Sequence, residues 1–131
     1  MESLLFGDIF RFKEGEYVYL ATGDGVDFAA KILDMKSTRQ IVDLDNRRAM
    51  KYNSGKSDGN SLYCYVILQT DEYRDQATHF GKSQYGSGQL IFEKIGCSLC
   101  VEDKQAIKNK ILDPNSSVPI GLREVILKMD I

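Results

Sequence analysis

The amino-acid sequence predicts a single α+β domain spanning residues 1–131, in which a small curled sheet of five to six strands is followed by C-terminal helices. Short runs of β-branched and aromatic residues, separated by Gly-rich or charged turns, occupy most of the chain before residue 100. Apolar residues at helical spacing are concentrated near the end. The length is that of one domain with one hydrophobic core.

Three strands are predicted in the first part of the chain. Residues 9–12 alternate apolar and polar side chains, and residues 17–22 repeat this pattern after a compact charged turn, which predicts a β-hairpin. A Gly-Asp-Gly turn at 23–25 precedes a mostly apolar strand at 26–33, whose composition indicates a central position in the sheet. Residues 37–52 are ambiguous, because their apolar side chains fit either a short helix or a strand.

The later part of the chain changes from strands to helices. Residues 53–61 contain no apolar side chain and are predicted to be an exposed loop. Residues 62–69 are the clearest strand, and residues 90–92 are predicted to form a shorter one. Helical spacing and an acidic first turn predict a helix over 101–111, and an additional helix is expected within 114–131.

The overall charge gives no argument for nucleic-acid binding, but the distribution of charge along the chain does. The sequence has 17 Lys and Arg against 19 Asp and Glu, a formal net charge of -2, so nucleic-acid binding does not follow from an overall basic excess. Residues 36–56 nevertheless hold six Lys or Arg against two Asp, which predicts a local basic face. No apolar run is long enough to span a membrane, and the N-terminus lacks the segments of a signal peptide, so a cytoplasmic protein is expected.

The cysteines are Cys64, Cys97 and Cys100, an odd count that is typical of a reducing compartment. The Cys97-x-x-Cys100 spacing is compatible with a zinc site completed by Cys64 and His79, or with a redox pair. A third interpretation, small core-filling residues, is favoured because the sequence contains one paired-ligand half-site and not two. No cofactor or metal is therefore expected.

The densest group of reactive side chains directly follows the clearest strand. Arg74, Asp75, Gln76 and His79 place a cation, a carboxylate base and hydrogen-bond donors within a short span. Such a group is suited to acid–base chemistry on a phosphodiester. The alternative is a set of solvated loop charges, and the spacing alone favours that simpler interpretation.

Short segments follow one another in a definite order between residues 6 and 112. They are Gly7-Asp8-Ile9-Phe10, the strand at 17–22, Lys36-Ser37-Thr38, Tyr65-Val66-Ile67-Leu68, Arg74-Asp75-Gln76, and the glycine, small-residue turn and helix at 96–111. In this order they resemble the MazF/PemK-like endoribonuclease toxins. The common order of the segments carries the resemblance.

The resemblance implies a fold, an activity and partners. The family fold is a small SH3-like curled β-barrel with a terminal helix. The family activity is metal-independent cleavage of single-stranded RNA by a homodimer, which a small antitoxin protein silences. By this resemblance Asp75 is the expected base, Arg74 is the acid or the phosphate clamp, and Ser37 or Thr38 lies near the scissile phosphate.

Further residues are candidates for RNA binding. Positive charge is available in Arg39, Arg47 and Arg48, and Gln76 and His79 add hydrogen-bonding groups. The tyrosines that could stack on bases are Tyr52, Tyr63, Tyr65 and Tyr73. The simpler alternative is a solvated loop face beside ordinary strand aromatics.

The turn between the first two strands departs from the family pattern. Family members hold an important Arg in a long loop there, whereas residues 13–16 form a short turn without Arg or His. Lys13 offers a positive charge but not a bidentate guanidinium. This difference favours a second hypothesis, a catalytically inactive barrel-fold module for binding or regulation.

Overall fold

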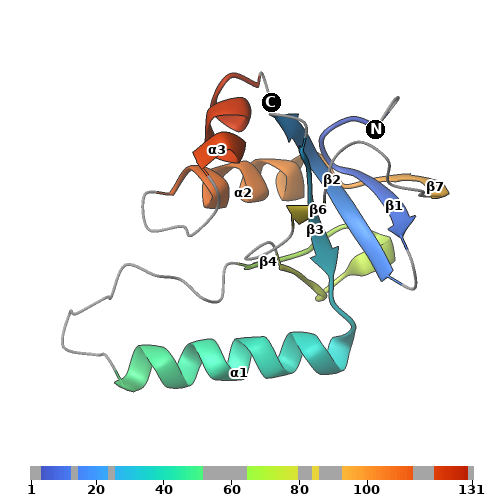
Figure 1. Cartoon of the computed structure of the whole chain (residues 1–131). Helices are drawn as coiled ribbons and strands as arrows, with labels where there is room; N and C mark the ends of the chain where they lie inside the picture. Colours follow the sequence, from blue (N-terminus) through green and yellow to red (C-terminus); the bar gives the residue numbers. More distant parts are fainter. Residues whose placement is uncertain are drawn as a thin grey trace.

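The computed structural model of this chain describes residues 4–12, 15–23, 26–51, 65–79, 84–85, 93–113 and 120–129. Within these ranges the protein is an α+β structure, as the sequence predicts, with an antiparallel sheet and three helices (Figure 1). The elements are β1 (Asp8–Phe12), β2 (Gly15–Gly23), β3 (Val26–Ile32), α1 (Met35–Lys51), β4 (Tyr65–Ile67), the 3-10 helix η1 (Asp71–Tyr73), β5 (Ala77–His79), β6 (Gln84–Tyr85), β7 (Glu93–Ser98), α2 (Val101–Leu112) and α3 (Ile120–Leu127).

The order of the strands in the sheet differs from their order in the chain. Six strands follow one another as β4-β5-β3-β2-β1-β7, and β6 also pairs with β3. The predicted hairpin of β1 and β2 is present, with Phe10 opposite Tyr17. On its other edge β1 pairs with β7, where Asp8 lies opposite Ser98. β1, the first strand of the chain, therefore lies between β2 and β7, the last described strand.

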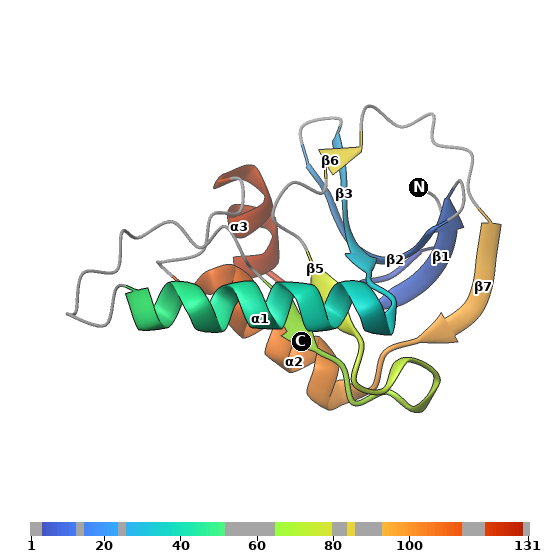
Figure 2. The same ribbon diagram turned by 90° about the horizontal axis from the view of Figure 1, so that it is seen from below.

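The sheet is curled but not closed (Figure 2). β4 and β7 lie at its two ends, and within the described residues no backbone pairing joins them. The predicted curled sheet with following helices is thus present, whereas closure into a barrel is not shown by these residues.

The ambiguous segment at 37–52 forms most of helix α1. Asp34 begins the helix, because its Oδ1 accepts the backbone N–H of Ser37 at 2.7 Å, and this bond lowers the pKa of Asp34. Thr38 and Ile41, three residues apart, are buried, while Leu44 is exposed. The sequence pattern does not identify this helix, because its apolar side chains point both toward the sheet and into solvent.

Some predicted segments fall partly or wholly outside the described residues. The loop at 53–61 and the strand at 90–92 lie outside them. Of the strand predicted at 62–69, residues 65–69 are described, and the first three of these form β4. The polar segment after β4 contains η1 and β5, which are three residues each and therefore too short to give a periodic pattern. Helix α3 lies within 114–131, where an additional helix is expected.

The two faces of the sheet carry separate apolar clusters. On one face Val18 of β2 packs in a cluster with Ile107 of α2 and Ile126 of α3, and all three are fully buried. On the other face Phe10 and Tyr17 stack with their ring centroids 5.7 Å apart. Hydrophobic burial on the first face therefore holds α2 and α3 to the sheet.

None of the helices in the described ranges has both the length and the apolar composition of a membrane-spanning segment.

A buried threonine tests the packing among β3, β4 and β5. Thr78 is fully buried opposite Ile32 and Val66, and no described residue hydrogen-bonds its hydroxyl. We expect Thr78→Val to raise the free energy of unfolding by about 1 kcal/mol, because it removes an unpaired buried hydroxyl at nearly constant shape. Denaturant titration followed by circular dichroism measures this change.

Thr38→Val is the matched control, since the Thr38 hydroxyl oxygen accepts the backbone N–H of Ala77 at 2.9 Å. The same substitution there leaves a buried N–H unpaired and should lower the free energy of unfolding by about 1–2 kcal/mol. Equal effects at the two threonines would contradict this difference in hydrogen bonding.

Candidate functional site

Two predicted site segments that are far apart in the sequence lie side by side. The backbone N–H of Leu33 donates to the carbonyl of Ala77 at 2.8 Å, and Gln76 Nε2 donates to the carbonyl of Leu33 at 2.9 Å. The N–H of Ala77 in turn donates to Thr38 Oγ1 at 2.9 Å. These bonds join the connection from β3 to α1 with the turn at 74–76.

The two predicted hydroxyl residues hold the first turn of α1 in place. Thr38 is only 4% exposed, and its oxygen receives the N–H of Ala77. Ser37 hydrogen-bonds Asp34 through both its backbone and its side chain, and these bonds lower the pKa of Asp34. Both residues thus have structural partners beside the turn at 74–76.

Arg74 is an exposed, ion-paired cation. Its Nη2 lies 2.8 Å from Asp71 Oδ1 across η1, and 63% of the Arg74 side chain is exposed. The hydrogen bond to Asp71 raises the pKa of Arg74 above its already high ordinary value, so the guanidinium keeps its charge. Asp71 therefore orients one edge of the guanidinium while solvent reaches the remainder.

Asp75 is the one non-glycine residue of the described chain with a left-handed backbone, at a φ of 68°. Its N–H donates to the carbonyl of Leu68 at 3.0 Å within the turn from β4 to β5. Asp tolerates this region better than most residues, because its short polar side chain bonds locally. The exposed carboxylate next to Arg74 is accessible to a substrate, as a general base must be.

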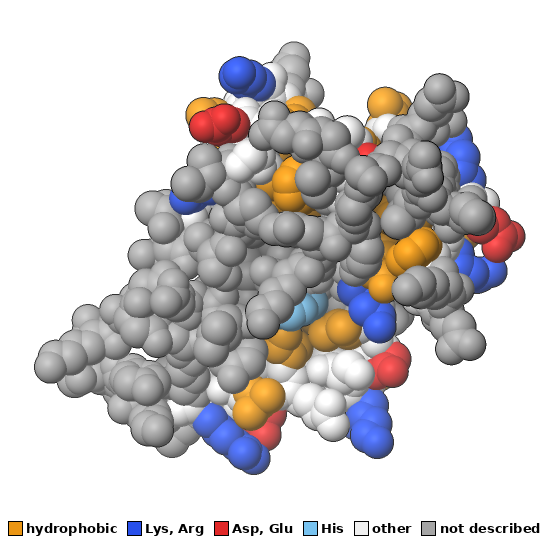
Figure 3. All heavy atoms as spheres, in the orientation of Figure 1, with side chains coloured by type: hydrophobic (Ala, Val, Ile, Leu, Met, Phe, Trp, Pro, Cys, Tyr) orange, Lys and Arg blue, Asp and Glu red, His pale blue; other side chains and the backbone are white. Residues whose placement is uncertain are grey.

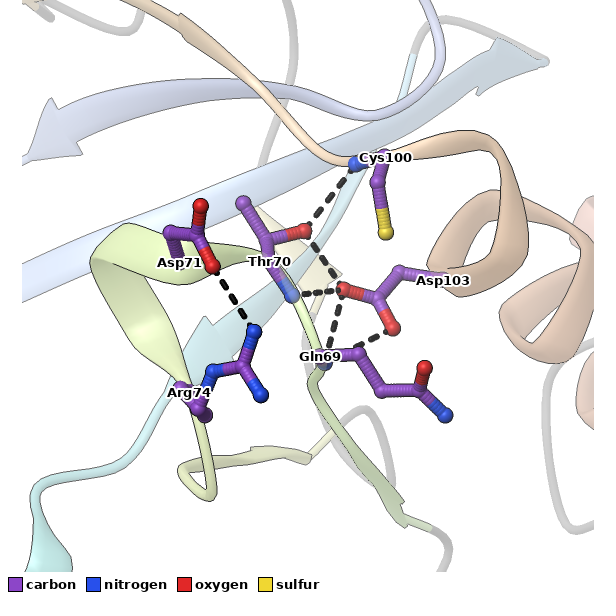
Figure 4. Close-up of polar contacts among 6 residues, drawn as sticks. All are labelled: Gln69, Thr70, Asp71, Arg74, Cys100 and Asp103. Atoms are coloured by element: carbon purple, nitrogen blue, oxygen red, sulfur yellow. Dashed lines mark hydrogen bonds and ion pairs between the residues drawn. The ribbon is translucent and has the colours of Figure 1, made fainter.

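A buried carboxylate attaches Gln69 and Thr70, which begin the turn from β4 to β5, to helix α2 (Figure 4). Asp103 is 1% exposed, and its Oδ2 accepts the Thr70 N–H at 2.7 Å and the Thr70 hydroxyl at 2.5 Å. The N–H of Gln69 reaches both Asp103 oxygens, and Thr70 Oγ1 accepts the N–H of Cys100 at 3.0 Å. Burial alone would raise the pKa of Asp103, but hydrogen bonds from Thr70 and Gln69 outweigh it and lower that pKa.

Tyr73 attaches the same turn to the sheet. Its buried side chain donates a hydrogen bond from the hydroxyl to the carboxylate of Glu16 in β2. Burial, followed by this bond, raises the pKa of Tyr73, so the phenol keeps its proton. With Thr70 held by α2 and Tyr73 by β2, two separate elements position Arg74 and Asp75.

An open pocket of about 400 Å³ lies beside Arg74. Asp71, Glu72 and Glu102 belong to its lining together with Arg74, so three carboxylates and one guanidinium share this pocket. Because negative charge repels phosphate, the pocket itself is poorly suited to hold one.

The described contacts of Arg39 and Arg47 lie on α1 and do not involve the turn at 74–76. Arg39 Nε donates to a backbone carbonyl one helical turn earlier at 3.3 Å, and Arg47 pairs with Asp43 at 2.8 Å, both on the exposed surface of α1. Arg48 belongs to α1, but its side chain lies outside the described parts. His79 is half-buried at the end of β5.

Sequence reasoning misses two residues that shape the site. Asp71 is three residues before Arg74. This spacing permits an ion pair on one helical turn, and it is the sequence signal from which the pair could have been predicted. Asp103 is the third residue after Cys100, the position of the acidic residue in a capping box. That pattern places a carboxylate at a helix start, but it does not reveal that Thr70 is its partner.

The cysteine pair does not have the geometry of a disulfide. Leu99 N–H donates to the carbonyl of Gly7 at 2.9 Å and continues the pairing of β7, so the chain is extended after Cys97. Cys97 and Cys100 are both free thiols, each half-buried. Burial, followed by the charge of Glu72, raises the pKa of the Cys97 thiol, as expected for a packing residue.

In the part of the chain that the structure describes, no three His, Cys, Asp or Glu side chains are grouped in a way that could hold a metal ion. Cys64, which the zinc alternative requires, lies outside that part.

No protein-family model, curated protein or solved structure shows a significant match to this chain. Its function is therefore inferred from the chemistry of Arg74, Asp75 and their neighbours.

The buried carboxylate provides a test of how the turn is held. Asp103→Asn should lower the free energy of unfolding near pH 7 by about 2–3 kcal/mol, because an amide brings its own N–H groups toward the donors of Thr70 and Gln69. Denaturant titration of both proteins measures the difference.

The pH dependence of the free energy of unfolding tests the role of Asp103 independently. Because the pKa of Asp103 is lowered, its stabilisation is present above the unfolded-state value of about 3.9 and is lost as pH falls through the lower folded-state value. The wild type should therefore lose stability below about pH 4 more steeply than Asp103→Asn. Parallel pH profiles for the two proteins would contradict the role of this carboxylate.

Proposed function

We propose that this protein is a metal-independent endoribonuclease of the MazF/PemK-like type that acts on single-stranded RNA. One observation carries the proposal: the turn with Arg74 and Asp75 is hydrogen-bonded to the start of α1, where Ser37 and Thr38 lie. The family resemblance assigns these same two segments to the scissile phosphate. The curled sheet with following helices is compatible with the SH3-like barrel that the resemblance implies.

Arg74 is suited to hold the phosphate. Its guanidinium carries five N–H donors in a fork that matches phosphate oxygens, and the described contact with Asp71 uses one edge of it. Because the pKa of Arg74 is raised, the side chain does not release its proton. It therefore acts as a clamp that stabilises negative charge in the transition state, and not as the acid.

Asp75 is suited to start the reaction. Its carboxylate takes the proton of the ribose 2′-hydroxyl, and the 2′-oxygen forms a bond to phosphorus. The bond from phosphorus to the 5′-oxygen breaks, and this leaving oxygen takes a proton from water. The products are a 2′,3′-cyclic phosphate and a free 5′-hydroxyl.

The partners in this proposal follow from the same resemblance. A second copy of the chain forms a homodimer, and a small antitoxin protein silences it in the cytoplasm. Single-stranded RNA is the substrate, and its binding weakens with salt because phosphate contacts release counterions.

The contacts of Thr38 favour a second candidate, a catalytically inactive binding or regulatory module. The hydroxyl of Thr38 is buried and accepts a backbone N–H, and Ser37 is bonded to Asp34, so neither is available to a phosphate without losing that bond. In this alternative the same turn binds a ligand and breaks no bond.

Substitution of Asp75 separates the two candidates. The purified protein is incubated with single-stranded RNA in the presence of a chelator, and products are resolved by electrophoresis. Asp75→Asn should lower the cleavage rate at least about a hundredfold, because a general base contributes that much. Its thermal unfolding should be nearly unchanged, because Asn tolerates the left-handed backbone at this position.

Glu124→Gln is the control, since it neutralises an exposed carboxylate on α3 and should leave the cleavage rate unchanged. Cleavage that survives Asp75→Asn contradicts the role of this carboxylate, and cleavage abolished by the chelator contradicts metal independence. RNA binding without any cleavage by the wild type favours the binding module.

A further inference from the structure

Four side chains form a line across the sheet. In the strand register Tyr65 of β4 lies opposite His79 of β5, His79 lies opposite Lys31 of β3, and Lys31 lies opposite Tyr17 of β2. Directly opposite residues of antiparallel strands project to the same side of a sheet. All four side chains therefore share one face. Tyr17 is buried in the cluster with Phe10, and the other three, Tyr65, His79 and Lys31, are hereafter called the cross-strand row.

This face is not the one that α2 and α3 cover. The alternate residues Val18, Ile32 and Val66 project to the opposite side, into the apolar cluster that α2 and α3 complete. Lys31 is exposed and the other two members of the row are half-buried, so the row reaches the surface. Figure 3 shows histidine, basic and hydrophobic side chains close together on this side of the molecule.

Helix α1 borders the cross-strand row. The Tyr65 hydroxyl donates to Asp45 of α1 at 3.1 Å, which fixes the position of the ring. Burial, followed by this bond, raises the pKa of Tyr65 to about 12, so the phenol is neutral. The charged residues of α1 are Lys36, Arg39, Arg47, Arg48 and Lys51 against Asp43 and Asp45. A protein with an acidic total thus places the most basic of its described helices beside this row.

Strand β5 connects the row to the turn with Arg74 and Asp75. Ala77 begins β5 and bonds Thr38, while His79 ends it within the row. His79 is four residues after Asp75, so their Cα atoms are at most about 14 Å apart, a distance that a short stretch of an extended ligand can cover. An extended polymer is the class of ligand that can contact both.

We propose that the cross-strand row binds single-stranded RNA, with a base stacked on the Tyr65 ring and a phosphate held by Lys31. Aromatic rings combined with cations are the mode by which proteins bind single strands without reading their sequence. The inference rests on the proposed function, because it names the surface that guides the same RNA to Arg74 and Asp75. A second copy of the chain fits this face less well, since a two-fold contact through the row brings like-charged Lys31 side chains together.

Binding of a non-cleavable RNA tests the row. A labelled, mixed-sequence 2′-O-methyl RNA lacks the 2′-hydroxyl nucleophile, and fluorescence anisotropy at several salt concentrations gives Kd and its salt dependence. Lys31→Gln should raise Kd about fivefold and lower the salt slope by about one, the effect of removing one phosphate contact. Lys128→Gln, an exposed lysine directly after α3, is the control and should change neither quantity.

Substitutions of Tyr65 separate stacking from structure. Tyr65→Leu should raise Kd about tenfold, the typical effect of losing one stacked base. Tyr65→Phe loses the bond to Asp45 but keeps the ring, so it should recover most of the binding that Tyr65→Leu loses. Thermal unfolding of each variant shows whether the fold is retained.

The outcomes distinguish this inference from the proposed function. Wild-type protein that cleaves RNA, with Kd and salt slope unchanged by Lys31→Gln and Tyr65→Leu, overturns the row and leaves the nuclease proposal standing. Wild-type protein that neither binds nor cleaves RNA overturns both. If gel filtration shows that the same two substitutions dissociate a dimer, the row is an interface between copies and the inference is wrong.

Discussion

The buried carboxylate of Asp103 is the contact on which the arrangement of the site depends. Its donors, Gln69 and Thr70, lie just before η1, whereas Asp103 itself belongs to the first turn of α2. A carboxylate is stable in a protein interior only when its hydrogen bonds are made, so the end of β4 and the start of α2 are fixed relative to each other. Arg74 and Asp75 follow within a few residues and take their positions from this contact.

The parts of the fold that the sequence predicts are those with a local signal. The hairpin of β1 and β2 is predicted by alternation over 9–12 and 17–22, and it is present. η1 and β5 have no such signal, because three residues are too few to show a period. Helix α1 could not be separated from a strand in the sequence, because its burial depends on contacts with β4 and β5 that only tertiary structure supplies.

The candidate site likewise contains some residues that the sequence predicts and others that it does not. Arg74 and Asp75 are conspicuous in the sequence because a cation and a base are adjacent after a strong strand. The residues around them are not conspicuous. Thr38 is joined to this region by accepting the backbone N–H of Ala77, and a backbone donor has no sequence signature. The cross-strand row is equally invisible, because Lys31 and His79 face each other only through the strand register.

The pairing of β1 with β7 has a consequence for biosynthesis. β1 and β2 pair as soon as both have left the ribosome, but the other edge of β1 has no partner until Ser98 has been made, and Asp103 follows later still. Until Asp103 has left the ribosome, Gln69 and Thr70, which precede the turn at 74–76, therefore lack their attachment to α2. A nascent chain that does not yet contain Asp103 therefore cannot hold Arg74 and Asp75 in the arrangement of the folded protein.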